Sequence, residues 1–232
     1  MPTVMITGAN RGLGLEYTRQ YLEQGWQVIA CTRQPDAPDL KALPDELLRI
    51  YELDIVDHAA VDQLSENLKD EPIDMLVNNA GTSGPEGFPE CATYSGIGNM
   101  DYQIWRQILE INLLGAFKVA TAFRGNLVKS DRGVLINMTS DLGSIAQNMQ
   151  GDLYSYRTSK AGLNIMTKGF ANEWPDIISI AMAPGWCRTE LGGTGAEIAP
   201  ADSVREQIKS IDRLTTSHSG CFLDRFGESV PW

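Results

Sequence analysis

Short apolar segments rich in β-branched residues alternate along the whole chain with longer amphipathic segments. The short segments have the composition of buried strands, and the longer ones repeat apolar residues at helical spacing. Strands are expected at Val4–Thr7, Trp26–Cys31, Leu48–Glu52, Met75–Asn78, Val134–Met138, Ile177–Ala183 and Cys221–Leu223. Helices are expected at Gly12–Gln24, Asp57–Lys69, Asp101–Val128, Leu153–Asn172 and Asp202–Leu214. This alternation predicts an α/β fold with a doubly wound, mostly parallel, seven-stranded sheet and helices on both faces.

Two glycine-containing segments, residues 82–100 and 185–200, lack this periodicity. Each follows the carboxyl end of an expected strand, the edge at which doubly wound sheets bind ligands. We therefore expect them to form the walls and lid of a substrate site, with disordered surface insertions as the alternative. No linker or repeat divides the chain, so residues 1–232 are expected to form a single domain.

Composition and charge narrow the possible partners. The formal net charge of −11 argues against nucleic acid and anionic membranes, so an anionic cofactor would need a local basic pocket. The four cysteines are dispersed and lack metal-binding spacing, which predicts reduced thiols and no metal site. Because no apolar run approaches ~18 residues and no basic leader follows Met1, we expect a cytoplasmic protein.

The segment Thr7–Gly14, TGANRGLG, joins the first expected strand to the first expected helix. Its glycines allow a tight turn and let backbone amides approach a pyrophosphate at the positive end of the helix dipole. An ordinary turn is the alternative, because the GxxxGxG spacing differs from the commoner GxGxxG pattern. Its position between strand and helix favours a dinucleotide-binding Rossmann fold.

The end of the second expected strand bears on cofactor choice, because an acidic residue there binds the ribose of NAD and repels the phosphate of NADP. Here the strand is followed by Thr32-Arg33, with no acid. Thr32 can donate to a phosphate, while Arg33 and Arg11 can supply positive charge. These residues favour NADP(H) over NAD(H), although both arginines could be ordinary surface residues. Asp54 is a candidate partner of the adenine amino group or a helix cap, a role for which Asp57 is better placed.

Tyr156 and Lys160 are four residues apart and should share one face of a helix. A phenol has a pKa of about 10, so its use as a base near neutral pH requires stabilising the phenolate by about 4 kcal/mol. Lys160 and the cationic ring of an oxidised nicotinamide could provide that stabilisation. Taken alone, such a pair is more often a surface pair. Tyr154 is a weaker candidate because its partner four residues on is the uncharged Thr158.

Six features together resemble the short-chain dehydrogenase/reductase family, in order and approximate spacing, over almost the entire chain. They are the glycine turn, Asn78-Asn79-Ala80-Gly81, Asn112, Ser140, Tyr156 with Lys160, and Pro184-Gly185 with Thr189. Within that family the chain is similar to C-factor-like and sniffer-like carbonyl reductases. That narrower resemblance rests on Pro184–Trp186, Leu191–Gly193, Gly220–Asp224, Gly227 and Val230–Trp232.

The family resemblance implies an NADP(H)-dependent oxidoreductase that reduces a carbonyl or oxidises the corresponding alcohol. Tyr156 would exchange the proton, Lys160 would hold the nicotinamide ribose and tune Tyr156, and Ser140 would bind the substrate oxygen. Asn112 would hold a water that links Lys160 to bulk solvent. Structural roles remain the alternatives: a helix irregularity at Asn112, and turns at Ser140 and at Pro184-Gly185.

The resemblance also implies the cofactor-binding residues. They are Gly8, Asn10, Arg11, Gly12, Leu13, Gly14, Thr32, Arg33, Asp54, Ile55, Asn79, Ala80, Gly81, Tyr156, Lys160, Pro184, Gly185, Trp186 and Thr189. Thr189 would bind the nicotinamide carboxamide, and Asn78 would buttress the sheet. Ser140, Leu142, Tyr156 and Trp186 are the expected substrate contacts.

The implied partner is a small-molecule carbonyl or alcohol. By analogy with the family we expect a homo-oligomer, dimer or tetramer, formed through the helices at residues 101–128 and 153–172. Some members of the C-factor branch are linked to intercellular signalling. A cofactor-binding signalling or sensor protein with little turnover is therefore the alternative function.

Overall fold

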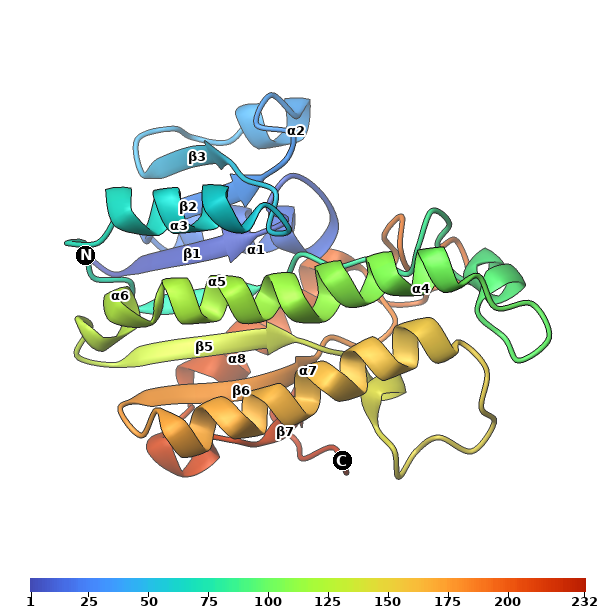
Figure 1. Ribbon diagram of the computed structural model, residues 1–232. Coiled ribbons are helices and arrows are strands. Elements are labelled where there is room, and N and C mark those ends of the chain that lie inside the picture. The colour runs from blue at the N-terminus through green and yellow to red at the C-terminus, as the bar shows by residue number, and fades with distance from the viewer.

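A computed structural model describes residues 1–232 and contains one seven-stranded sheet with the strand order β3-β2-β1-β4-β5-β6-β7. All neighbouring strands pair in parallel, which confirms the expected doubly wound Rossmann-type architecture in a single domain (Figure 1). The strands are β1 (Thr3–Thr7), β2 (Gln27–Thr32), β3 (Leu48–Glu52), β4 (Met75–Asn78), β5 (Gly133–Met138), β6 (Ile177–Ala183) and β7 (Phe222–Asp224). Each strand begins and ends within one residue of its predicted bounds.

The central strands are apolar on both faces because each face is covered by helices. In β1, Val4 and Ile6 point into one apolar core, whereas Met5 points into the other. The same alternation divides Val77 and Leu76 in β4 between the two cores. This period of two within a continuous apolar run is what a parallel sheet between two helical layers requires.

One face is covered by α1 (Gly12–Glu23) and α8 (Pro200–Asp212), which are joined by a buried hydrogen bond of 2.7 Å from the Tyr17 hydroxyl to the Gln207 amide oxygen. The other face carries α3 (His58–Asn67), α5 (Ala116–Ala122) and α7 (Tyr154–Glu173) (Figure 1). A short α2 (Pro38–Lys41) precedes β3. Asp57 caps α3, as expected, by accepting the amide of Ala60 at 3.0 Å.

The prediction of one continuous helix at residues 101–128 was wrong in detail. This region contains α4 (Tyr102–Leu109), a π-helical turn (Glu110–Gly115), α5 and α6 (Arg124–Val128). The apolar spacing continues across the breaks and by itself predicts one helix, although a helix irregularity at Asn112 was one of the alternatives for that residue. Tertiary contacts fix the irregularity: the Asn112 side chain bonds Thr82, and the Asn126 amide donates to the main-chain carbonyl of Leu68.

The two segments without periodicity both lie at the carboxyl edge of the sheet. Residues 82–100 contain one 3₁₀ turn, η1 (Glu90–Tyr94). Residues 185–199 contain only an isolated bridge between Cys187 and Ile198, and Pro200 is the first residue of α8. The segments touch, because the Phe88 amide donates to the Leu191 carbonyl at 2.8 Å. Two further 3₁₀ turns, η3 (Asp141–Gly143) and η4 (Thr216–His218), follow β5 and α8. None of the helices combines the length and apolar character needed to cross a bilayer.

Candidate active site

A cavity of about 990 Å³ opens at the carboxyl edge of the sheet, between the glycine turn and the two irregular segments. Nearly all of the expected site residues line it. They are Gly8, Asn10, Arg11, Gly12, Leu13, Thr32, Arg33, Asp54, Ile55, Asn79, Ala80, Gly81, Ser140, Leu142, Tyr156, Lys160, Pro184, Gly185, Trp186 and Thr189. Gly14 and Asn112 lie behind the wall. Strand order explains the assembly, since the carboxyl ends of β1, β4 and β5 are adjacent.

The turn after β1 needs glycine for steric reasons. Gly8 and Gly12 have φ values of +67° and +55°, a region that side chains rarely adopt. A β-carbon on Gly14 would collide with the carbonyl of Gly8. Arg11, at the N-cap of α1, makes no side-chain cap bond, so the first amides of the helix are available to an anion. The turn therefore has the shape and the donors that a pyrophosphate requires.

Side-chain bonds join the ends of β1 and β4 beneath this turn. The Asn79 amide donates to the carbonyls of Thr7 and Gly8, at 2.9 and 3.3 Å. In return, the Thr7 hydroxyl oxygen accepts the main-chain amides of Asn79 and Ala80, both at 3.1 Å. Asn78 points the other way and donates to Asn137 and to the Ala116 carbonyl, both at 3.0 Å. The glycine turn is thus fixed to the neighbouring strand.

The far end of the cavity carries two arginines, each beside an acid. Arg33 lies 4.0 Å from the Asp54 carboxylate, and Arg11 forms an ion pair with Glu190. All four side chains are exposed to solvent. Thr32 is buried, and its hydroxyl oxygen accepts the amide of Gln34 at 3.1 Å. Without a ligand, the two arginines are solvated and paired with carboxylates. A phosphate group bound here would offer them an alternative anionic partner.

The π-helical turn places Asn112 under the cavity floor. Its side-chain oxygen accepts the amide of Thr82 at 2.8 Å, and its amide donates to the Thr82 carbonyl at 2.8 Å and the Ser159 hydroxyl at 3.0 Å. Asn112 thereby ties the start of the first irregular segment to α7. A β-carbon on Gly81 would lie 3.3 Å from Asn112 and 3.4 Å from Lys160, so a small residue suits this position.

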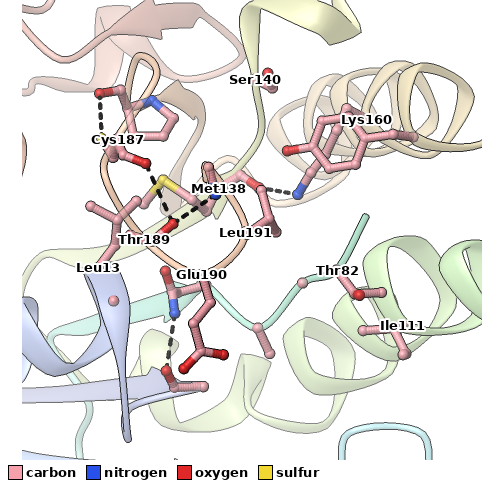
Figure 2. A pocket seen from close by; sticks show the side chains of 18 of the residues that line it. Leu13, Thr82, Ile111, Met138, Ser140, Lys160, Cys187, Thr189, Glu190 and Leu191 are labelled. Carbon is pink, nitrogen blue, oxygen red and sulfur yellow. Dashed lines mark hydrogen bonds between the residues drawn. The ribbon is translucent and has the colours of Figure 1, made fainter. Parts of the chain in front are cut away.

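Tyr156 and Lys160 lie on the inward face of α7 and are 6% and 4% exposed. The Lys160 ammonium donates to the Met138 carbonyl at 2.8 Å (Figure 2). It lies 5.6 Å from the centre of the Tyr156 ring. Ser140 follows β5, and its hydroxyl oxygen accepts the Leu142 amide at 3.2 Å. The hydroxyl proton of Ser140 therefore remains free to be donated elsewhere.

Burial dominates the ionisation of this pair. Desolvation raises the pKa of Tyr156 above its ordinary value, an effect that the nearby Ser140 hydroxyl partly offsets. Desolvation also lowers the pKa of Lys160 to about 8. The phenol is therefore a protonated acid at neutral pH. The lysine can change its charge within a pH range that is accessible to the folded protein.

The segment after β6 forms the other wall of the cavity. Gly185 has a φ of +77°, and the Pro184 carbonyl before it accepts the Ser203 hydroxyl of α8 at 2.7 Å. The Trp186 indole donates to the Gly192 carbonyl at 2.8 Å, and the Thr189 hydroxyl oxygen accepts the Gly192 amide at 3.0 Å. These bonds curl the segment on itself and direct it across the glycine turn.

Several residues that line the cavity were not among the predicted site residues. Glu190 and Leu191 belong to the second irregular segment, Phe88 to the first, and Met138 and Thr139 to the end of β5. The last two could have been found, because they immediately precede Ser140. No local pattern distinguishes Phe88 or Glu190, whose positions depend on contacts distant in sequence. No cluster of three or more His, Cys, Asp or Glu side chains is arranged to hold a metal ion.

The sequence profile of the short chain dehydrogenase family matches residues 2–197. The chain belongs to this family. It is 36% identical to the C-signal of Myxococcus xanthus over 163 residues, which cover 69% of this chain and 93% of that protein. The family match and the similarity to known dehydrogenases and carbonyl reductases show that the chain is an NAD(P)-dependent oxidoreductase that acts on CH–OH or C=O groups.

Solved structures of family members overlay the whole chain. The carbonyl reductase Sniffer of D. melanogaster has a TM-score of 0.90 at 29% identity, with complete coverage of both chains. An NADPH-bound carbonyl reductase from chicken fatty liver has a TM-score of 0.89 at 27% identity, covering 100% of this chain and 99% of that one. This family member therefore has the same fold as proteins solved as carbonyl reductases.

Proposed function

We propose that the chain uses NADP(H) to reduce an aldehyde, ketone or quinone, or to oxidise the corresponding alcohol, with Tyr156 as the acid or base. One observation carries the proposal. Tyr156, Lys160 and Ser140 line the same cavity whose opposite end holds the glycine turn and two arginines. A proton donor and a dinucleotide cradle thus share one enclosed space.

The residues present fit a dinucleotide. Gly8, Gly12 and Gly14 allow the turn to fold tightly against neighbouring protein atoms, and the free amides at the start of α1 suit a pyrophosphate. When bound, NADP(H) supplies or accepts the hydride. The protein then has to hold the carbonyl in place and manage the proton.

Proton transfer follows from the geometry of Tyr156 and its neighbours. Because burial keeps the phenol protonated, Tyr156 can donate to a carbonyl oxygen that becomes negatively charged. Ser140 can donate to the same oxygen, since the Leu142 amide orients its hydroxyl. The Lys160 ammonium would stabilise the resulting phenolate through its charge. Asn112 would position the relay that returns the proton from solvent.

A preference for NADP(H) over NAD(H) is supported by Arg11 and Arg33. The ribose phosphate of NADP would replace Glu190 and Asp54 as the partner of these two cations. Substrate contacts are assigned to Ser140, Leu142, Tyr156 and Trp186, all of which line the cavity.

The test is direct: purified protein with NADPH is challenged with a panel of aldehydes, ketones and quinones, and absorbance of the reduced cofactor is followed. Cofactor oxidation that depends on at least one carbonyl compound supports the proposal. Stoichiometric NADPH binding without oxidation by any member of the panel would overturn it.

A second candidate function is favoured by the similarity to the C-signal of Myxococcus xanthus. In that case cofactor binding would control a partner, with little turnover. Protein that binds NADPH, turns over no carbonyl and loses a partner on Arg33→Asp would support it. The presence of Asn112, Ser140, Tyr156 and Lys160 together favours the enzyme, because a pure binding protein needs no proton donor.

We further propose that the chain forms a homo-oligomer, a dimer or tetramer. Leu114, Phe117 and Ile165 are 48%, 47% and 74% exposed on the helical layer formed by the π-turn, α5 and α7. Light scattering of the wild type and of Ile165→Glu tests this, and a wild-type mass of one chain contradicts it.

The four free cysteines agree with a reducing, cytoplasmic setting.

A further inference from the structure

Phe88, in the first irregular segment, packs directly on Tyr156. The two ring centres are 5.3 Å apart with an interplanar angle of 86°, an edge-to-face arrangement. Phe88 also lines the cavity that holds Ser140 and Lys160. The ring thus stands beside the phenol to which a substrate carbonyl has to bind.

The second irregular segment fixes Phe88 through its main chain. The Phe88 amide donates to the Leu191 carbonyl at 2.8 Å. Gly193, with a φ of +73°, lies against the carbonyl of Phe88, and Gly87 lies against the carbonyl of Glu190. A β-carbon at either glycine would collide with those carbonyls, so the two segments meet at a distance that only glycine permits. Phe88 is therefore held from both sides.

The rest of this half of the cavity combines apolar and aromatic side chains with the carboxylates of Asp141 and Asp152. Leu142, Leu153, Leu191 and Trp186 line it together with Phe88. The indole of Trp186 is fixed by its bond to Gly192, and a β-carbon on Gly195 would lie 3.2 Å from its ring. Lys160 is the basic residue here, since the other two that line the cavity, Arg11 and Arg33, belong to the glycine-turn end.

We infer that Phe88 is a specificity-determining residue that selects a carbonyl compound with a flat aromatic ring next to the carbonyl. Once the carbonyl oxygen reaches Tyr156 and Ser140, the adjoining substituent has to lie against the fixed Phe88 ring. A flat ring can pack against that ring, whereas a puckered saturated ring of the same size is thicker. This inference rests on the proposed carbonyl reduction.

The test compares benzaldehyde with cyclohexanecarbaldehyde, which present a flat and a puckered six-membered ring. The benzaldehyde to cyclohexanecarbaldehyde ratio of kcat/KM should fall about five- to tenfold in Phe88→Leu, mainly through KM. Because the ratio is compared between variants, the intrinsic reactivities of the aldehydes cancel. Phe88→Tyr should retain the wild-type ratio. Phe117→Leu, a matched change on α5 outside the cavity, should leave it unchanged.

A binding measurement separates this inference from the reaction itself. Saturation-transfer NMR on NADP⁺-loaded protein should show benzyl alcohol favoured over cyclohexylmethanol, with the preference lost in Phe88→Leu and kept in Phe88→Tyr. If the wild type turns over no aldehyde but prefers benzyl alcohol, and Phe88→Leu loses this binding preference, the proposed reaction would be overturned and the role of Phe88 supported. The role of Phe88 would be overturned if the Phe88→Leu protein melts and binds NADP⁺ normally but keeps the wild-type ratio of kcat/KM for the two aldehydes. It would also be overturned if Phe88→Tyr lowers that ratio as much as Phe88→Leu.

Discussion

The ammonium of Lys160 lies 5.6 Å from the centre of the Tyr156 ring while it donates a 2.8 Å hydrogen bond to the Met138 carbonyl. One cation thus joins α7 to the end of β5 and sets the electrostatic environment of the phenol. Both side chains are buried, so the charge of the Lys160 ammonium acts on the phenol with less screening than in bulk water. This arrangement leads to the first two predictions.

Removing the Tyr156 hydroxyl should abolish carbonyl reduction and spare cofactor binding. Tyr156→Phe should lower kcat by about 10²- to 10⁴-fold, because the general acid is lost. The NADPH dissociation constant should change little, since the glycine turn and the arginines remain. Steady-state kinetics and fluorescence titration measure the two quantities. If Tyr156→Phe retains its turnover, Tyr156 is not the proton donor.

Lys160 should make the free energy of unfolding depend on pH. Its folded pKa is about 8, against an ordinary value of 10.5, so the unfolded chain retains this proton over a range in which the folded chain has lost it. Stability from this group therefore rises as pH increases from about 8 to 10.5. Relative to Lys160→Met, the wild type should gain up to about 3 kcal/mol across that window.

Urea unfolding of both proteins at the two pH values measures this difference, and Lys209→Met on the exposed face of α8 controls for loss of a lysine. A constant difference between wild type and Lys160→Met would show that burial does not depress the pKa of Lys160. Lys160→Met should also impair turnover, because the charge that stabilises the Tyr156 phenolate is lost.

Arg33 should carry much of the preference for NADP(H). Arg33→Asp replaces a cation near the ribose phosphate with an anion and should weaken NADPH binding about 10- to 100-fold. NADH binding should stay the same or improve. Arg106→Asp makes the same change in charge on α4 outside the cavity and serves as the control. Equal losses for both cofactors would argue against a phosphate contact at Arg33.

Gly14 should tolerate no side chain. A β-carbon there would overlap the Gly8 carbonyl, so Gly14→Ala should lower stability by about 1–3 kcal/mol and weaken NADPH binding. Gly169→Ala on α7 is the matched control, since no atom lies within 4 Å of its added β-carbon. That change should be neutral or stabilising by up to about 1 kcal/mol. Thermal melts with and without NADPH measure both effects.

Sequence reasoning recovered the regular parts of the fold because their pattern is local. The apolar runs at Leu48–Glu52, Met75–Asn78 and Ile177–Ala183 match β3, β4 and β6 residue for residue. The break between α5 and α6 was missed, because the pattern stays periodic there and a distant contact decides, the bond from Asn126 to Leu68. The irregularity at Asn112, whose side chain bonds Thr82, had been only an alternative. The short helices α2 and η1 were also missed, because such brief turns carry no periodic signal.

The sequence alone determined the family, the parallel sheet and the order in which the glycine turn, Ser140, Tyr156 and Lys160 occur. Those properties follow from residue type, spacing and period, which are encoded along the chain. Only the tertiary structure decided that Phe88 meets Tyr156, that Arg11 pairs with Glu190, and that Lys160 is buried enough to lower its pKa. These depend on how segments far apart in sequence pack at one sheet edge, where desolvation and close contact arise together.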